Sequence, residues 1–171
     1  MTGYTLSRRH LLTLAASAAL PPRLARAQTV REIGWEDLIP PGVPYSEIVG
    51  PGYMDEDSDT WLPEFDANAT RMNTDLDGQV VKLPGYIIPM ETSAAGTTAF
   101  VLVPYVGACI HVPPPPPNQL VYVTTAEPWP SEDIWTAIWV TGTLRTRLQS
   151  TAIAEIGYEL SAVAIEEYEW P

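Results

Sequence analysis

The sequence is poor in cysteine and histidine, the residues from which many metal and catalytic sites are built. Cys109 is the only cysteine, so a disulfide within the chain is excluded. Haem-attachment and thioredoxin-type motifs are excluded for the same reason, because each needs two cysteines. The stability of the protein must therefore come from a hydrophobic core, for which aliphatic residues and six tryptophans supply the material.

Long apolar runs are also missing. A membrane span needs about 20 apolar residues, and the run Leu11 to Leu20 has ten. This run follows a basic start with Arg8 and Arg9, and it precedes a small-x-small site at Ala25-Arg26-Ala27. That order is typical of a signal peptide over residues 1–27. The arginine pair resembles a twin-arginine signal, and an ordinary secretory signal is the alternative. We expect a soluble, periplasmic or otherwise extracytoplasmic protein without membrane insertion after cleavage.

Basic charge is scarce once the signal is removed. Four of the nine basic residues, Arg8, Arg9, Arg23 and Arg26, lie in the signal, which leaves five basic against 21 acidic residues and a net charge of −16. Such a protein repels phosphates and anionic lipid headgroups, which excludes nucleic acid as a partner. It attracts cations or a basic protein surface, although the charge also serves simply to keep an exported protein in solution.

The mature chain has two parts that differ in amino-acid composition and pattern. Residues 28–75 are rich in proline, glycine and acids, and they predict an irregular arm that wraps a better-ordered body; only Trp35 to Ile39 is suited to one helical turn. Residues 76–168 predict a mainly β domain, a small five-stranded and partly closed barrel of the OB type, with a β-sandwich as the alternative. Its expected strands are 79–90, with a kink or bulge at Pro84-Gly85, then 99–106, 120–125, 134–144 and, after a polar link, 157–165. We expect its core to include Val101, Val103, Tyr122, Ile138, Val140 and Leu160.

Two segments resemble a known bacterial family. The string Gly107-Ala-Cys-Ile-His-Val-Pro-Pro-Pro-Pro-Pro-Asn-Gln119 and the strand Leu76 to Glu91 are similar to an exported family known as domain of unknown function 3299. The resemblance covers most of residues 76–168 and implies an extracytoplasmic β domain. It also implies a protein partner associated with transport, such as an ABC-transporter component. It assigns no catalytic residues.

Cys109 and His111 form the most reactive pair in the sequence. On an extended chain they project from one face, roughly 6–7 Å apart, and can share a zinc or copper ion. Met90 or Glu91 is the candidate additional ligand, the thioether favouring copper and the carboxylate zinc. The alternative is a buried structural cysteine beside a hydrogen-bonding histidine. A cysteine-dependent enzyme with Cys109 as nucleophile and His111 nearby is the competing function.

The five prolines Pro113, Pro114, Pro115, Pro116 and Pro117 predict a rigid polyproline II segment. With Asn118 and Gln119, this segment is the candidate partner-binding surface, because a preformed helix of this kind loses little entropy on binding. The alternative is packing within the protein itself, against Trp129, Trp135 or Trp139. In that case Asn118 and Gln119 serve to satisfy backbone groups. The sequence thus predicts an exported accessory or binding protein rather than an enzyme.

We predict that the protein recovered from outside the cytoplasm begins at or near Gln28, which N-terminal sequencing or intact mass measurement will test. Replacing both Arg8 and Arg9 with lysine should block export if the twin-arginine route is used. A stable extracytoplasmic form that starts at Met1 would contradict the prediction.

Overall fold

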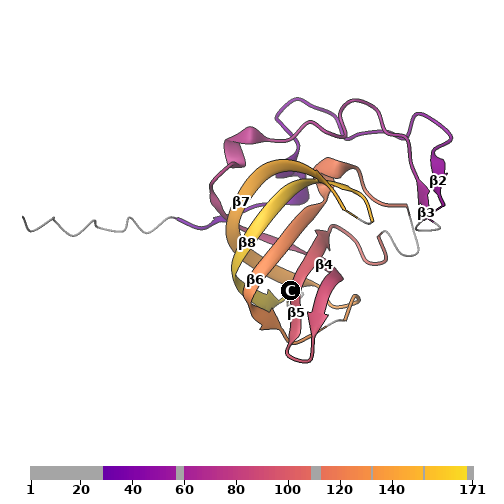
Figure 1. The fold of residues 1–171 in the computed structure, drawn as a ribbon. Coiled ribbons are helices and arrows are strands. Elements are labelled where there is room, and N and C mark those ends of the chain that lie inside the picture. The colour runs from indigo at the N-terminus through magenta and orange to yellow at the C-terminus, as the bar shows by residue number, and fades with distance from the viewer. Residues whose placement is uncertain (1–28, 57–59, 109–112, 132, 152, 169–171) are drawn as a thin grey trace, which may run out of the picture.

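The structure, a computed structural model, describes residues 29–56, 60–108, 113–131, 133–151 and 153–168 (Figure 1). Within these residues it contains eight strands and three short 3-10 helices, and no α-helix. In chain order the elements are β1 (Arg31–Glu32), η1 (Trp35–Leu38), β2 (Tyr53–Asp55), β3 (Thr60–Leu62), η2 (Thr74–Leu76), β4 (Val80–Ser93), β5 (Gly96–Val103), η3 (Pro117–Gln119), β6 (Val121–Trp129), β7 (Ile138–Ser150) and β8 (Glu155–Glu167). No helix in the described part has the length and apolar character needed to cross a membrane.

Five strands form a closed barrel. They pair in the order β4, β5, β6, β8, β7, and a further pairing of β4 with β7 closes the ring. Only β6 and β8 run parallel; the other four pairs are antiparallel. The short β1 adds to β4 in parallel as an extra strand. The predicted mainly β, OB-like barrel is confirmed, and its ring of strand pairings is complete.

The predicted kink at Pro84-Gly85 is the place where β4 changes partner. Residues Val80–Gly85 pair with β7, and the strand pairs with β5 from Tyr86 onward. A side chain at Gly85 would not fit, since a Cβ there would lie 2.7 Å from the Val103 carbonyl oxygen. The irregular pairings of β4 come later, on either side of Glu91.

All five predicted strands are present, and their ends differ from the prediction. The largest difference is the polar link expected after Leu144, which is a β-hairpin: β7 continues to Ser150 and β8 begins at Glu155. Polar residues are tolerated there because one face of the hairpin is in solvent. Arg147, for example, is exposed and forms an ion pair with Glu159 at 3.3 Å.

The barrel wall separates two apolar clusters. The larger fills the barrel and includes Val81, Phe100 and Leu160, together with Ile33, Leu38 and Leu76 from the N-terminal side. The smaller cluster, which includes Ile88, Val101, Val103, Ala108, Leu120 and Ile156, is built on the opposite face of β4 and β5, because successive strand residues point to opposite faces. Of the six expected core residues, Val101, Val103, Ile138, Val140 and Leu160 are buried. Tyr122 is half-buried against the smaller cluster.

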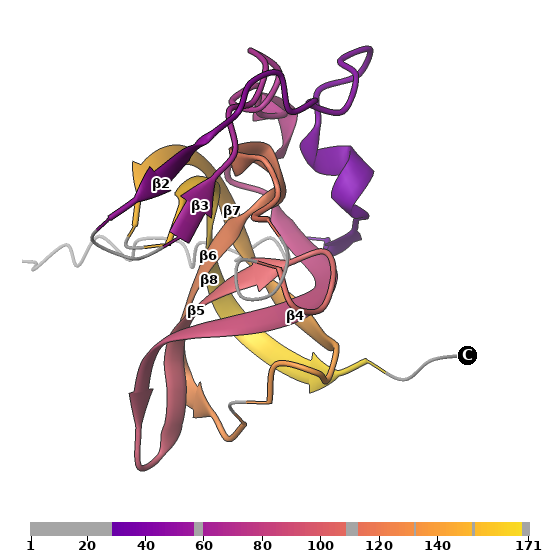
Figure 2. The same ribbon diagram turned by 90° about the vertical axis from the view of Figure 1, so that its right-hand side faces the viewer.

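The arm crosses one end of the barrel, as Figures 1 and 2 show from two directions. The helical turn expected from Trp35 is present as η1. A single side chain of β8 holds two points of this region: the buried hydroxyl of Tyr158 donates to the Leu38 carbonyl oxygen at 2.5 Å and accepts from the Asn73 amide at 2.6 Å. The arm is thus fastened to the barrel by buried hydrogen bonds as well as by apolar contacts.

We predict that Tyr158→Phe lowers the free energy of unfolding by about 1–3 kcal/mol, because it leaves two buried backbone groups without the hydroxyl partner. Urea unfolding followed by tryptophan fluorescence will measure the change. Tyr122→Phe is the matched control, since the Tyr122 hydroxyl makes no hydrogen bond within the described residues. Equal stability of the two variants would contradict the role of Tyr158.

A second prediction concerns alkaline pH. Burial raises the pKa of Tyr158 from 10.0 to about 12, against the opposing effect of the Asn73 amide, which favours the phenolate. The pKa of Tyr158 is higher in the folded state than in the unfolded state, so the neutral phenol stabilises the folded protein fully below pH 10.0. This stabilisation is lost as the pH rises towards about 12. Unfolding measured across this window should show a steeper loss of stability in the wild type than in Tyr158→Phe. Identical pH profiles would show that Tyr158 is not the responsible group.

Candidate functional site

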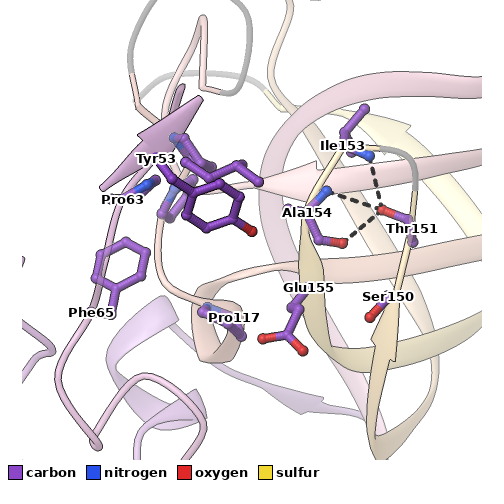
Figure 3. Close-up of a pocket in the computed structure, with 12 residues that line it drawn as sticks. Tyr53, Pro63, Phe65, Pro117, Ser150, Thr151, Ile153, Ala154 and Glu155 are labelled. Atoms are coloured by element: carbon purple, nitrogen blue, oxygen red, sulfur yellow. Dashed lines mark hydrogen bonds between the residues drawn. The ribbon is translucent and has the colours of Figure 1, made fainter. Parts of the chain in front are cut away.

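A groove of about 340 Å³ lies between the arm and the barrel, and we call it the arm groove (Figure 3). One wall comes from the β2–β3 region, the second from the proline segment, and the third from the tip of the β7–β8 hairpin. Its lining residues are Tyr53, Leu62, Pro63, Phe65, Pro114, Pro115, Pro117, Ser150, Thr151, Ile153, Ala154 and Glu155.

The first wall is a small antiparallel ladder within the arm. Tyr53 pairs with Leu62 across β2 and β3, and an isolated bridge joins Ile48 to Phe65 further along. This ladder places the aromatic rings of Tyr53 and Phe65 on the groove. The Tyr53 side chain remains 63% exposed, so its ring is available for a ligand.

Asp66 fixes the base of this wall. Its carboxylate accepts hydrogen bonds from the Ser46 hydroxyl at 2.8 Å, the Asn68 amide at 2.8 Å and the Glu47 amide at 3.4 Å. These donors, with the Ser46 hydroxyl as the largest contributor, hold the pKa of the Asp66 carboxyl below its usual value. Asp66 therefore stays ionised near neutral pH and has a structural role.

The second wall is the proline segment, most of which is buried rather than exposed on the surface. Pro113 is exposed, whereas Pro114, Pro115, Pro116 and Pro117 are buried within the protein. The Pro113 carbonyl oxygen accepts from the Tyr105 hydroxyl at 3.2 Å. Further along, Gly157 allows β8 to pass close to the segment, since a Cβ there would lie 2.8 Å from the Pro117 carbonyl oxygen.

Asn118 and Gln119 are buried and bind the arm. The Asn118 side-chain amide donates to the carbonyl oxygens of Asn68 at 2.9 Å and Arg71 at 3.0 Å, and that of Gln119 donates to Trp35 at 3.0 Å. These contacts fit the alternative in which both residues satisfy backbone groups of the protein itself. Tyr53 and Phe65 are the aromatic residues that line the groove together with Pro114, Pro115 and Pro117.

The third wall is the hairpin tip, which Thr151 holds closed. Its hydroxyl donates to the Ala154 carbonyl oxygen at 2.9 Å, and the amide of Thr151 donates to the same oxygen at 2.9 Å. Figure 3 shows Thr151 and Ala154 across the groove from Tyr53, with Glu155 near Pro117. Ile153 adds an apolar side chain and Glu155 a negative charge to this wall.

The groove is chemically suited to binding. Among the described residues that line it, Tyr53 and Glu155 are the ionisable ones, and most of the rest offer apolar or proline surface. A segment of extended chain with an apolar side chain and a positive charge would match these walls. Tyr53 and Phe65 were not predicted from the sequence, since the arm has no periodic pattern; the turn residues Gly50-Pro51-Gly52 before Tyr53 were the available signal. Ile153 was not predicted because it lies in the segment between the expected strands 134–144 and 157–165.

The predicted metal site is only partly visible. Cys109 and His111 lie outside the described residues, so metal binding by them stays a prediction. Met90 packs against the smaller apolar cluster together with Ala108, the residue before Cys109, whereas Glu91 is exposed. Within the described part of the chain, no three His, Cys, Asp or Glu side chains gather to hold a metal ion.

Comparison with known proteins gives a family and a related fold. A family model described as "Protein of unknown function (DUF3299)" matches residues 35–167. The crystal structure of a DUF3299 family protein from Pseudomonas aeruginosa PAO1 is similar, with 38% sequence identity, a TM-score of 0.67, and coverage of 84% of this chain and 99% of that one. No curated protein matches the sequence.

The family match begins at Trp35, so it includes most of the arm as well as the barrel. The unit that the family shares thus contains every wall of the arm groove. Since the family model covers most of the chain and the related crystal structure is similar over its whole length, the chain belongs to the family of proteins of unknown function DUF3299.

Proposed function

We propose that the mature protein is an exported, soluble accessory protein that holds an extended segment of a partner protein in the arm groove. The observation that carries this proposal is the groove itself, whose walls come from two parts of the chain, the arm and the barrel, that hydrogen bonds tie together. Walls that are already in place lower the entropy lost when a ligand is ordered.

The chemistry of the walls indicates what the partner segment carries. Tyr53 presents an exposed ring opposite Ile153, and an aromatic or aliphatic side chain between them would be removed from water. Glu155 and the net charge of −16 expected after signal cleavage favour a basic residue beside that anchor. A basic, extended segment of an extracytoplasmic transport component, the kind of partner that the family resemblance implied, would meet both requirements.

The alternative of a cysteine-dependent enzyme is independent of this groove, because it rests on Cys109 and His111. Zinc or copper binding by the same pair, with Met90 or Glu91, would be an additional property of the protein.

The proposal predicts a position-specific crosslink. A photoreactive phenylalanine analogue at Tyr53 should capture a discrete extracytoplasmic partner in intact cells, whereas the same analogue at the exposed Val163 on β8 should not. Binding of the captured segment, made as a synthetic peptide, would then be measured with purified protein by isothermal titration calorimetry. Tyr53→Ala should weaken it about tenfold, the loss of one aromatic contact at an interface.

The matched control is Val163→Ala, which removes a comparably exposed apolar side chain outside the groove. Glu155→Lys should weaken binding further in low salt than in high salt, because salt screens the lost attraction and the new repulsion. Two results would refute the groove as the binding site. One is the same crosslinked product from positions 53 and 163, and the other is peptide binding that neither Tyr53→Ala nor Glu155→Lys changes.

A further inference from the structure

A second, smaller cavity lies at the barrel corner where β4 leaves β7 to pair with β5. It has a volume of about 130 Å³, and its walls include three aromatic side chains from distant parts of the chain: Trp35 of η1, Tyr86 of β4 and Tyr168, which follows β8. Pro84, Pro104 and Gly85 complete much of the surface. We call this cavity the aromatic pocket, and it shares no lining residue with the arm groove.

Trp35 is held in place on two sides. Its indole Nε1 donates a hydrogen bond of 2.8 Å to the Pro84 carbonyl oxygen. Its ring lies against Gly85, where a Cβ would approach to 3.0 Å. Gly85 is therefore required for the ring to reach this position, and the indole N–H is already used.

Tyr168 is positioned by two contacts as well. Its backbone amide donates to the Ala137 carbonyl oxygen at 2.9 Å, and its ring centroid lies 5.1 Å from that of Trp139. Tyr86 belongs to the β4–β5 ladder, opposite Val103. The three rings are therefore carried by parts of the protein that are fixed by hydrogen bonds.

The walls select one class of ligand. They consist mainly of aromatic rings, proline rings and aliphatic atoms, and the described residues that line the pocket include no Asp, Glu, Lys or Arg. Because the Trp35 N–H is committed to Pro84, the indole contributes its π surface and has no hydrogen bond to offer a peptide carbonyl. An anion is disfavoured by the net negative charge of the protein, and a primary ammonium would have to exchange its hydrogen bonds to water for the few acceptors of a mainly apolar wall.

A quaternary ammonium meets all of these conditions, since it is positively charged, has an apolar surface and needs no hydrogen-bond acceptor. Aromatic side chains attract such cations through the negative potential of their faces. We propose that the aromatic pocket binds the trimethylammonium group of a small molecule, with Trp35, Tyr86 and Tyr168 as the contacting side chains. This property goes beyond the proposed function, because it concerns a different site and a small-molecule ligand.

The test uses choline as the probe, with the mature protein and isothermal titration calorimetry. The comparison ligand is the uncharged isostere of choline in which a tert-butyl group replaces the trimethylammonium group. Choline should bind with at least about tenfold higher affinity than this isostere, because only the cation gains from the aromatic faces. Tyr168→Leu should weaken choline binding about tenfold, whereas Tyr168→Phe, which keeps the ring, should bind as the wild type does.

Tyr53→Leu in the arm groove is the matched control and should leave choline binding unchanged. Circular dichroism and melting curves will show that the Leu variants are folded, and Tyr86→Leu provides a second ring deletion if Tyr168→Leu is not. Equal binding of choline and its isostere, unchanged binding after loss of either ring, or no binding of choline at tens of millimolar would each overturn the proposal. None of these results bears on the partner crosslink at Tyr53, so the two proposals fail separately.

Discussion

The Tyr158 hydroxyl bonds to two backbone groups of the region before the barrel that are far apart in the sequence. They are the carbonyl of Leu38, the last residue of η1, and the amide of Asn73, just before η2. Both partners and the hydroxyl are shielded from water, so losing the contact would leave polar groups unsatisfied in the core. Because the arm carries Tyr53 of the groove and Trp35 of the aromatic pocket, the geometry of both cavities depends on this junction.

The proline segment forms the second junction. It runs between the arm and the β7–β8 hairpin, with Asn118 and Gln119 donating to arm carbonyls on one side and Gly157 giving it room on the other. The arm alone is built from strands of two or three residues and 3-10 turns, which are marginal as independent structures. Its order thus derives from contacts with the barrel, and the family match that extends over both parts is in keeping with one folding unit.

Much of the barrel could be predicted from the sequence, because apolar and polar residues tend to alternate along a strand, and this alternation is visible locally. Val101, Ile138 and Leu160 were assigned to the core in this way and are buried. The arm could not be predicted in such detail. The hydrogen bonds that fix it join Asn73 to Tyr158 and Gln119 to Trp35, pairs that are 85 and 84 positions apart, and no local pattern encodes such contacts. The surroundings of Cys109 and His111 lie outside the described residues, so that part of the predicted site stays a prediction.

The burial of the proline segment has a simple physical reason. A buried peptide group normally needs a partner for its N–H, and proline has none, so a run of prolines can cross the interior with only carbonyl oxygens to satisfy. Proline also fixes φ, which reduces the entropy lost when the segment is ordered. The missing N–H and the fixed φ made the proline segment a candidate rigid ligand for another protein, and the same two properties suit a segment that forms an internal wall. Placed beside Tyr53 and Phe65, that wall gives the groove a fixed surface, so a partner segment would bear most of the ordering cost of binding itself. A flexible, hydrogen-bonding loop in the same place would add its own ordering cost and weaken the complex.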